Sequence, residues 1–465
     1  MRIFEEMERL YEWELVLMLD GVRTRVTQDS RKILDDARIM LNWKNRYDDR
    51  TELLEEIWIR LEIKSDRKVE LVHFHLDVPQ DYKPEDRIFV NGYQSWTESR
   101  EFAPDEAIPP LKMPFKRLLN TTGDYTFFPH SNKKGYLHSH LFTYVRRGAE
   151  CVLYADQEPK SGYTVFETRV KEGKMRMHKF NAGERPTEEC VLLKVRIRRG
   201  LPDVAAQEAL AKYRPLSAPA PVSGWTSWYH YYTRIDERII LDNLAAFRNR
   251  NTPISIFQID DGWQVAIGDW LNANEKFPRG MKHLADEIHA AGYQAGLWLA
   301  PFIVEQKSWI YQEHPDWLLT YDGEKPVAAG FNPGWGGMFK GTYYVLDLGK
   351  EEVKAYLRKV FQTVLGEWGY DVVKLDFLFA MGLIPRGGLS RGQWMHAGME
   401  FLKECIAENG AEKYMLACGV PIAAAAEHAA YCRIGPDIGL TWDMKSARAI
   451  NLRERISTKN AIGNA

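Results

Sequence analysis

The sequence has few cysteines, no excess of charge of either sign and no long hydrophobic run. Its five cysteines are an odd number at wide spacings, which predicts neither a disulfide framework nor a zinc ribbon. Lys and Arg number 62 against 64 Asp and Glu, so the net charge of −2 indicates no nucleic-acid partner and no membrane surface. No apolar run approaches the roughly 18 residues of a membrane span, and the acidic N-terminus is unlike a signal peptide. A cytoplasmic protein is expected.

Aromatic residues, in contrast, are abundant: 15 Trp, 22 Tyr and 20 Phe among 465 residues. So many indoles indicate either large cores or surfaces that stack on flat apolar faces, which sugars present. The 45% of hydrophobic and 27% of charged residues exclude a disordered or fibrous chain. At roughly 150 residues per domain, the length suggests about three domains, or a large one and a smaller one.

The first half of the chain alternates apolar and polar residues in short runs separated by turn residues. This pattern is typical of antiparallel strands with one face in water, and it predicts a large β-sandwich over residues 1–213. The clearest runs lie at 57–63, 69–78, 141–148, 151–155 and 190–200. A proline-rich stretch at 214–221 predicts a linker.

From residue 222 to 465, short apolar runs alternate with amphipathic stretches. The runs lie at 222–228, 254–260, 293–301, 371–377, 414–420 and 430–437, and the predicted helices at 236–250, 281–292, 350–369 and 391–410. This repetition predicts a parallel sheet buried on both faces, and a TIM-type (β/α) barrel is favoured over an open sheet. In such barrels the chemistry lies at the carboxyl ends of the strands. The residues there are Trp225, Trp228, Asp260, Asp261, Trp298, Lys374, Asp376, Cys418, Arg433 and Asp437.

Asp376 and Lys374 are two residues apart on one predicted strand and should share a face. They form either a buried structural ion pair or a carboxylate kept ionised by the lysine and able to act as a nucleophile. Asp437 follows Gly435-Pro436 and is either the N-cap of a helix or a general acid/base. Two carboxylates in one pocket, about 5–5.5 Å apart, are the equipment of a retaining glycosidase.

The adjacent Asp260 and Asp261 diverge too strongly to be that pair, and they fit better as acceptors for sugar hydroxyls. A divalent-metal site is the alternative, but no His or third carboxylate lies near them in the sequence. Cys418 is either a buried core residue or a ligand contact. His138 and His140 have metal-like spacing but are interpreted as structural. No metal and no cofactor are expected.

Six strings in this order resemble the α-galactosidases of glycoside hydrolase family 36. They are GWTSWYHYY, FQIDDGWQ, GLWLAPF, VVKLDFLF, LACGVP and CRIGPD, and NGYQSW at 91–96 resembles the family too. The resemblance implies an N-terminal β-supersandwich, a (β/α)8 barrel and a C-terminal β domain. It implies retaining hydrolysis of terminal α-1,6-linked galactose from melibiose- and raffinose-type sugars. Asp376 would be the nucleophile and Asp437 the acid/base. The sugar would be bound by Trp96, Asp260, Asp261, Trp298, Lys374, Cys418 and Arg433.

Three other functions use the same scaffold: an α-N-acetylgalactosaminidase, a galactosyl transferase, and an inactive sugar-binding fragment. The fragment is considered because only six barrel strands are counted and one helical stretch, 444–464, follows Asp437. The seventh and eighth strands and the C-terminal β domain are not found. A truncated barrel is therefore expected, and this chain alone should be poorly soluble or nearly inactive. A homo-oligomer stays open, since no sequence feature fixes a symmetry.

Overall fold

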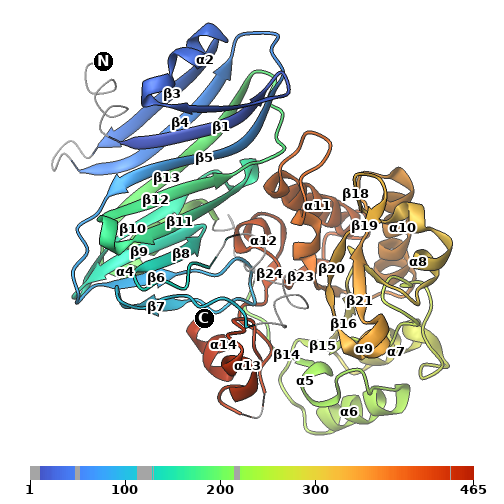
Figure 1. Cartoon of the computed structure of the whole chain (residues 1–465). Coiled ribbons are helices and arrows are strands. Elements are labelled where there is room, and N and C mark those ends of the chain that lie inside the picture. Colours follow the sequence, from blue (N-terminus) through green and yellow to red (C-terminus); the bar gives the residue numbers. More distant parts are fainter. Residues whose placement is uncertain are drawn as a thin grey trace.

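The computed structural model describes residues 11–47, 53–112, 128, 130–213, 220–439 and 441–464. A β-sandwich and a curved parallel sheet flanked by helices lie side by side (Figure 1). Most of the predicted linker, residues 214–219, lies outside the described residues, so that boundary stays a prediction.

The sandwich consists of two antiparallel sheets, as the alternating pattern predicts. Ile57, Ile59 and Leu61 of β4 point into the core between the sheets, and polar residues alternate with them. The first sheet contains, in spatial order, β2 (Val22–Thr27), β1 (Glu12–Leu19), β5 (Val69–Pro79), β12 (Lys174–Phe180), β11 (Tyr163–Arg169) and β8 (Tyr136–His140). The second contains β3 (Ile39–Tyr47), β4 (Leu54–Ile63), β13 (Glu189–Gly200), β10 (Glu150–Asp156), β9 (Phe142–Arg147), β6 (Arg87–Val90) and β7 (Arg100–Phe102). Two short helices, α2 (Lys32–Asp36) and α4 (Pro202–Ala209), pack on β3 and on β10 and β13.

The second half forms one parallel sheet whose strands lie inside the six predicted runs. In order they are β14 (Gly224–Thr226), β15 (Ile256–Ile259), β16 (Gln294–Leu299), β22 (Val372–Leu375), β23 (Tyr414–Ala417) and β24 (Tyr431–Cys432). The accompanying helices are α5 (Trp228–Tyr231), α6 (Glu237–Asn249), α7 (Gly280–Ala290), α10 (Glu351–Phe361), α11 (Arg391–Ala407) and α12 (Ile422–His428). All four residues of β22 are buried, as expected for a strand covered on both faces. The sheet is thus a partial TIM-type barrel, and the interpretation that two strands are missing by truncation stays a prediction.

A subdomain between β16 and β22 was not predicted. It contains the small antiparallel sheet β17 (Ile303–Glu305), β21 (Thr342–Val345) and β20 (Ala328–Phe331), the hairpin β18 (Thr320–Tyr321) and β19 (Lys325–Pro326), and the helices α8 (Trp309–Glu313) and α9 (Pro333–Lys340). Its strands are too short for a clear alternation, so the sequence pattern carries little signal.

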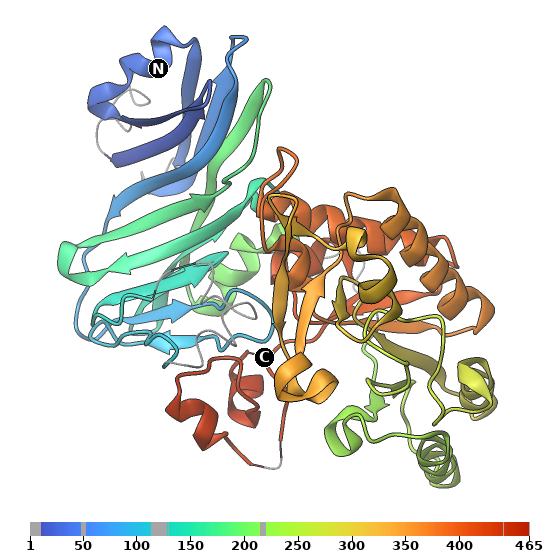
Figure 2. The ribbon, with the colours of Figure 1, turned by 45° about the vertical axis from the view of Figure 1, so that its right-hand side comes forward.

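The prediction of one helical stretch after Asp437 is wrong. Residues 444–464 contain two short helices, α13 (Lys445–Ala449) and α14 (Thr458–Asn464), which lie below the sandwich (Figure 2). Asn464 holds them there, because its amide donates to the Thr97 carbonyl and its Oδ1 accepts from the Ser99 backbone N–H. The tail therefore contacts the sandwich.

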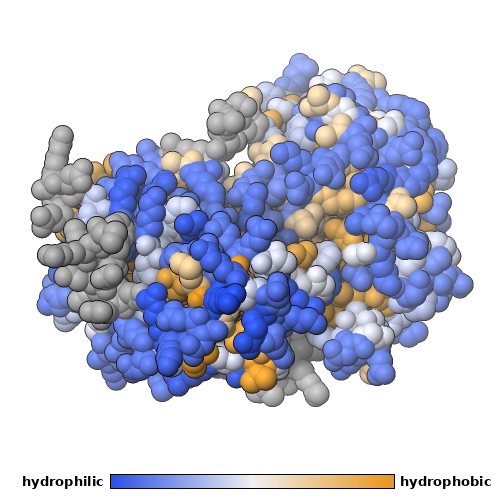
Figure 3. All heavy atoms as spheres, turned by 90° about the horizontal axis from the view of Figure 1, so that it is seen from above, coloured by the Kyte–Doolittle hydropathy of each residue, from blue (hydrophilic) through white to orange (hydrophobic). Residues whose placement is uncertain are grey.

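No helix within the described part of the chain is long and apolar enough to span a bilayer. The face seen from above is mostly hydrophilic, with small scattered hydrophobic areas (Figure 3).

Candidate active site

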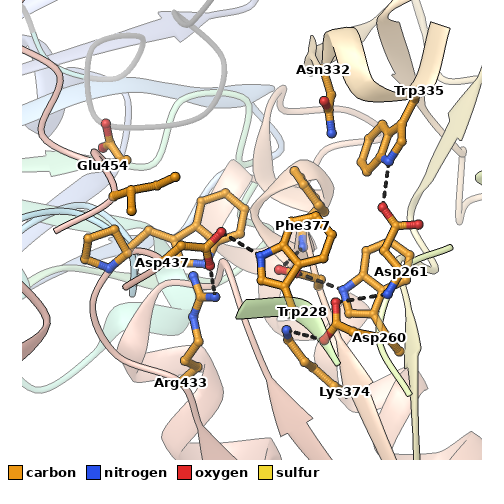
Figure 4. Close-up of a pocket in the computed structure, with 15 residues that line it drawn as sticks. Trp228, Asp260, Asp261, Asn332, Trp335, Lys374, Phe377, Arg433, Asp437 and Glu454 are labelled. Carbon is orange, nitrogen blue, oxygen red and sulfur yellow. Dashed lines mark hydrogen bonds and ion pairs between the residues drawn. The ribbon is translucent and has the colours of Figure 1, made fainter. Parts of the chain in front are cut away.

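A pocket opens at the carboxyl ends of the barrel strands, where the barrel meets the sandwich and the C-terminal tail (Figure 4). Eight of the nine predicted site residues line it: Trp96, Asp260, Asp261, Trp298, Lys374, Asp376, Arg433 and Asp437. The pocket thus brings together predicted residues that are separated by up to 341 positions in the sequence, from Trp96 to Asp437.

Asp376 directly follows β22, and its backbone N–H donates to the carbonyl of Leu299 in the neighbouring strand. Its carboxylate accepts hydrogen bonds from the indole Nε1 of Trp298 at 3.0 Å and from the backbone N–H of Phe377 at 2.9 Å. The side chain is buried, at 7% exposure. Two donors therefore hold the carboxylate in one orientation within the pocket.

Lys374 does not pair with Asp376, contrary to the expected ion pair. Its ammonium lies 2.8 Å from Oδ2 of Asp260, on β15's end. Burial works against the charge of Lys374, yet the negative charge of Asp260 outweighs it and raises the pKa of Lys374 above the ordinary lysine value. Asp260 also accepts from Gln258 at 2.7 Å and from Thr226 at 3.2 Å. This carboxylate already has a cation beside it, which argues against the divalent-metal alternative.

Asp261 points to the opposite side of its strand end, as successive strand residues do. Its carboxylate accepts from Gln264 at 2.6 Å and from the indole of Trp335 at 2.8 Å. Burial raises the pKa of Asp261 to about 6, although both hydrogen bonds act in the opposite direction. Asp261 therefore changes its charge in mildly acidic solution.

Asp437 is not a helix N-cap, because the next helix, α13, begins eight residues later. Its carboxylate accepts from Arg433 at 2.6 Å and from the indole of Trp228 at 2.9 Å. Burial favours the neutral acid, but the charge of Arg433, the Trp228 hydrogen bond and the charge of Lys374 outweigh it. They lower the pKa of Asp437 below the ordinary aspartate value. Arg433 therefore supports ionised Asp437.

Cys418 does not line the pocket, so the expected sugar contact is not found. It is fully buried, and its sulfur accepts a hydrogen bond from the indole of Trp96 at 3.2 Å. Gly419 beside it has a φ of +60°, and a Cβ there would lie 2.6 Å from the Trp96 ring. Ser95 anchors the same loop, since its backbone N–H donates to the Val420 carbonyl at 2.9 Å. The loop after β23 thus positions the one indole that the sandwich contributes.

Two other indoles of the barrel, Trp225 and Trp263, lie outside the pocket. Trp225 stacks on Phe257 with ring centroids 4.3 Å apart, and buried Trp263 donates to the Trp298 carbonyl at 3.0 Å. Neither lines the pocket. Trp263 supports the backbone of Trp298. Trp225 and Trp263 are most simply core residues.

Six lining residues were not predicted as part of the site: Phe377 and Pro436, which adjoin predicted residues, and four residues from two other segments. Asn332 is the N-cap of α9 in the inserted subdomain and Trp335 lies in that helix, and Glu454 and Ile456 come from the tail. One signal was present: Asn332 precedes Pro333, and an Asn N-cap followed by Pro at the first helical position is typical of a helix start. The tail offers no comparable signal.

His138 and His140 contact other rings in the sandwich. His138 packs against Phe128 and His130, with centroids 4.8 and 4.7 Å apart. Neither belongs to a group of three metal-ligating side chains within the described residues, which agrees with a structural role.

The comparisons with known proteins point to one family. Residues 205–400 match the melibiase family model. The matched segment is about two fifths of the chain and contains β14, β15, β16 and β22 of the parallel sheet. An α-galactosidase of Lactobacillus acidophilus is 28% identical over 173 residues, which is 36% of this chain and 21% of that protein. One of Geobacillus stearothermophilus is 29% identical over 175 residues, or 36% and 22%. The match thus covers about a fifth of the curated relatives' length.

The solved structures extend the similarity across nearly the whole chain. The α-galactosidase of Thermus thermophilus in complex with stachyose superposes with a TM-score of 0.70 at 26% identity, covering 97% of this chain and 84% of that one. The family 36 α-galactosidase of Geobacillus stearothermophilus gives 0.59 at 16% identity, covering 94% and 66%, and supports the fold alone. The resemblance inferred from the motifs is confirmed. The segment that matches the melibiase model contains all barrel residues of the pocket up to Phe377.

The raised pKa of Asp261 predicts a pH-dependent sugar affinity. Ionised Asp261 accepts hydrogen bonds, and protonation below about pH 6 replaces an acceptor site with a donor. A neutral α-galactoside should therefore bind about tenfold more weakly for each pH unit below 6 if only the ionised form binds. Calorimetric titration of an Asp376→Asn variant, which avoids turnover, measures this. An Asp261→Asn variant should lose the inflection, and an inflection that persists in it would assign the effect to another group.

Proposed function

We propose that this protein is a retaining α-galactosidase that releases terminal α-1,6-linked galactose from melibiose- and raffinose-type oligosaccharides. One arrangement carries the proposal: Asp376 and Asp437, each held by an indole N–H, line the same pocket together with Asp260 and Asp261. Two carboxylates serve as nucleophile and acid/base in such enzymes. The remaining two fit hydrogen bonds to sugar hydroxyls. The Thermus thermophilus relative, solved with stachyose, supports this substrate class.

In this mechanism the oriented carboxylate of Asp376 attacks the anomeric carbon, while Asp437 donates a proton to the leaving oxygen. Asp437 then deprotonates the water that releases galactose. The lowered pKa of Asp437 suits the second step, because the base must be ionised. Proton donation in the first step is correspondingly disfavoured, because the protonated form of Asp437 is less populated. We therefore expect activated aryl galactosides to be hydrolysed much faster than melibiose.

Lys374 and Asp260 form the floor of the site. When the sugar displaces water from the pocket, this buried ion pair can still donate and accept hydrogen bonds. Trp96 of the sandwich and Trp298 of the barrel supply apolar faces in the same pocket. The sandwich thereby has a functional reason to pack against the barrel mouth.

The direct test compares p-nitrophenyl α-galactoside with the corresponding α-N-acetylgalactosaminide. The proposal predicts turnover of the galactoside that is at least about a hundredfold faster, and free galactose as the product when melibiose is the substrate. Preferred turnover of the acetamido sugar, or transfer of galactose to an added sugar without hydrolysis, would contradict it. Saturable galactose binding with no turnover of either glycoside would identify an inactive binding protein instead.

A further inference from the structure

A second polar cluster lies where the barrel helices meet the sandwich, and the sugar site does not use it. His396 of α11 and the consecutive residues Glu427 and His428 at the end of α12 each offer one ligand atom, and these atoms lie within 4.8 Å of one another. His396 also lines a narrow cavity between the two domains, together with His140 of the sandwich. None of the three ligand residues lines the sugar pocket.

The donor set is that of a zinc site. Two imidazoles and one carboxylate, with a water in the fourth position, are a common ligand set for Zn²⁺. Metal–ligand distances of about 2.1 Å in a tetrahedron place two ligand atoms about 3.4 Å apart. Nδ1 of His396 and Oε2 of Glu427 are 3.5 Å apart. The ligand atom of His428 lies within 4.8 Å of the other two, so it has to approach by at most about 1.4 Å, which a side-chain rotation at the helix end can supply.

The two imidazoles are poorly accounted for without a ligand. His396 is 7% exposed, and Nδ1 of His396 and Nε2 of His428 are buried atoms that form no hydrogen bond within the described residues. Buried polar atoms ordinarily have a partner. A neutral imidazole nitrogen without a proton is a lone-pair donor, which is the form that binds a metal.

Lys160 is the group that competes for the site. Its ammonium lies 3.0 Å from Oε2 of Glu427, so a Lys160–Glu427 ion pair links the sandwich to the barrel in the absence of a metal. The Lys160 side chain is 54% exposed, however, and can turn into solvent. These contacts explain the position of Glu427, and Nδ1 of His396 faces Oε2 of Glu427 at 3.5 Å. Nε2 of His428, however, has no hydrogen-bond partner among the described residues.

We propose that His396, Glu427 and His428 bind a divalent transition-metal ion of the zinc type. The ion joins α11 to α12 beside the sandwich and displaces Lys160 from Glu427. The ion has a structural role, because it connects the two helices at the domain junction, and it takes no part in the hydrolytic steps. A ligand that binds the folded protein and not the unfolded chain stabilises the folded protein. The ion should therefore also raise the melting temperature.

The test is calorimetric titration of the chelator-treated full chain with ZnCl₂, together with its Tm with and without the ion. We expect one saturable site and a higher Tm with zinc. His396→Ala and His428→Gln should each weaken the affinity at least about tenfold, since each removes a direct ligand. His283→Ala is the matched control: His283 pairs with Glu287 on α7 and does not belong to the cluster, so the variant should bind zinc like the parent.

Lys160→Met separates the metal site from a purely polar junction. Removing the competing ammonium should leave zinc affinity unchanged or raise it, whereas a junction held only by the ion pair would lose Tm in that variant and gain none from zinc. Absence of a saturable site in the parent chain, or equal affinity in His428→Gln and the parent, would overturn the proposal. Cobalt provides a second readout, because the absorption bands of four-coordinate Co²⁺ should appear in the parent and vanish in His428→Gln.

Discussion

Replacing Asp376 by glycine is expected to reduce turnover of p-nitrophenyl α-galactoside by about 10⁴-fold or more, because the variant has no nucleophile at the anomeric carbon. The small side chain leaves space beside the indole of Trp298, whose N–H holds the carboxylate in the parent. Added azide should enter that space and restore turnover. It attacks from the side of the missing carboxylate, so the product should be β-galactosyl azide, detectable by NMR.

Asp316→Gly is a suitable control for this prediction. Asp316 is an exposed aspartate of the same half of the chain and does not line the pocket. That variant should keep the parent rate and show no response to azide. Unchanged activity in Asp376→Gly would contradict the nucleophile assignment.

Replacing Asp437 by alanine should slow substrates according to their leaving group. Melibiose needs a proton on the departing oxygen, and loss of the acid should cost about 10²- to 10⁴-fold. A nitrophenolate leaves without that help, so the first step with the aryl substrate should change about tenfold or less. Azide should again accelerate the reaction, but here it attacks the galactosyl–enzyme and gives the α-azide.

The opposite azide stereochemistry of the two variants distinguishes the roles of the two aspartates. Equal slowing of melibiose and the aryl galactoside by Asp437→Ala would contradict an acid role. A Trp228→Phe variant adds a graded comparison, because it removes one hydrogen bond to the carboxylate and keeps the Arg433 pair. Its turnover of melibiose should fall more than its turnover of the aryl galactoside, as in Asp437→Ala, but by a smaller factor.

The architecture could be predicted to a large extent because the periodicities differ so clearly between the two halves. β4 alternates with period two, and β22 is buried throughout, and each pattern permits only one kind of sheet. Where the pattern is short or absent, as in the strands of the 303–345 subdomain and in the tail, the prediction failed. The helices of the tail are short and depend on contacts with the sandwich, such as those of Asn464, which no local pattern encodes.

The candidate site could be predicted as a set of residues but not as a set of pairs. The strand-end rule identified Lys374, Asp260 and Asp376, yet period two suggested the wrong partner for the lysine. The actual partner, Asp260, is 114 residues away in the sequence. It follows β15, which is separated from β22 in the sheet by β16. Such pairings depend on strand order and curvature. Trp335 was missed for the same reason, since only the fold of the inserted subdomain brings it to Asp261.

The most direct test of the account is to trap the covalent intermediate that retention requires. A 5-fluoro-galactosyl fluoride, whose ring fluorine slows release of the intermediate, should inactivate the protein. It should add one fluorogalactosyl mass to the peptide that contains Asp376, as measured by mass spectrometry after digestion. The Asp376→Asn variant should gain no mass. A label on another residue, or continued hydrolysis of the galactoside with no label and an inverted first product, would contradict Asp376 as the nucleophile and the retaining mechanism with it.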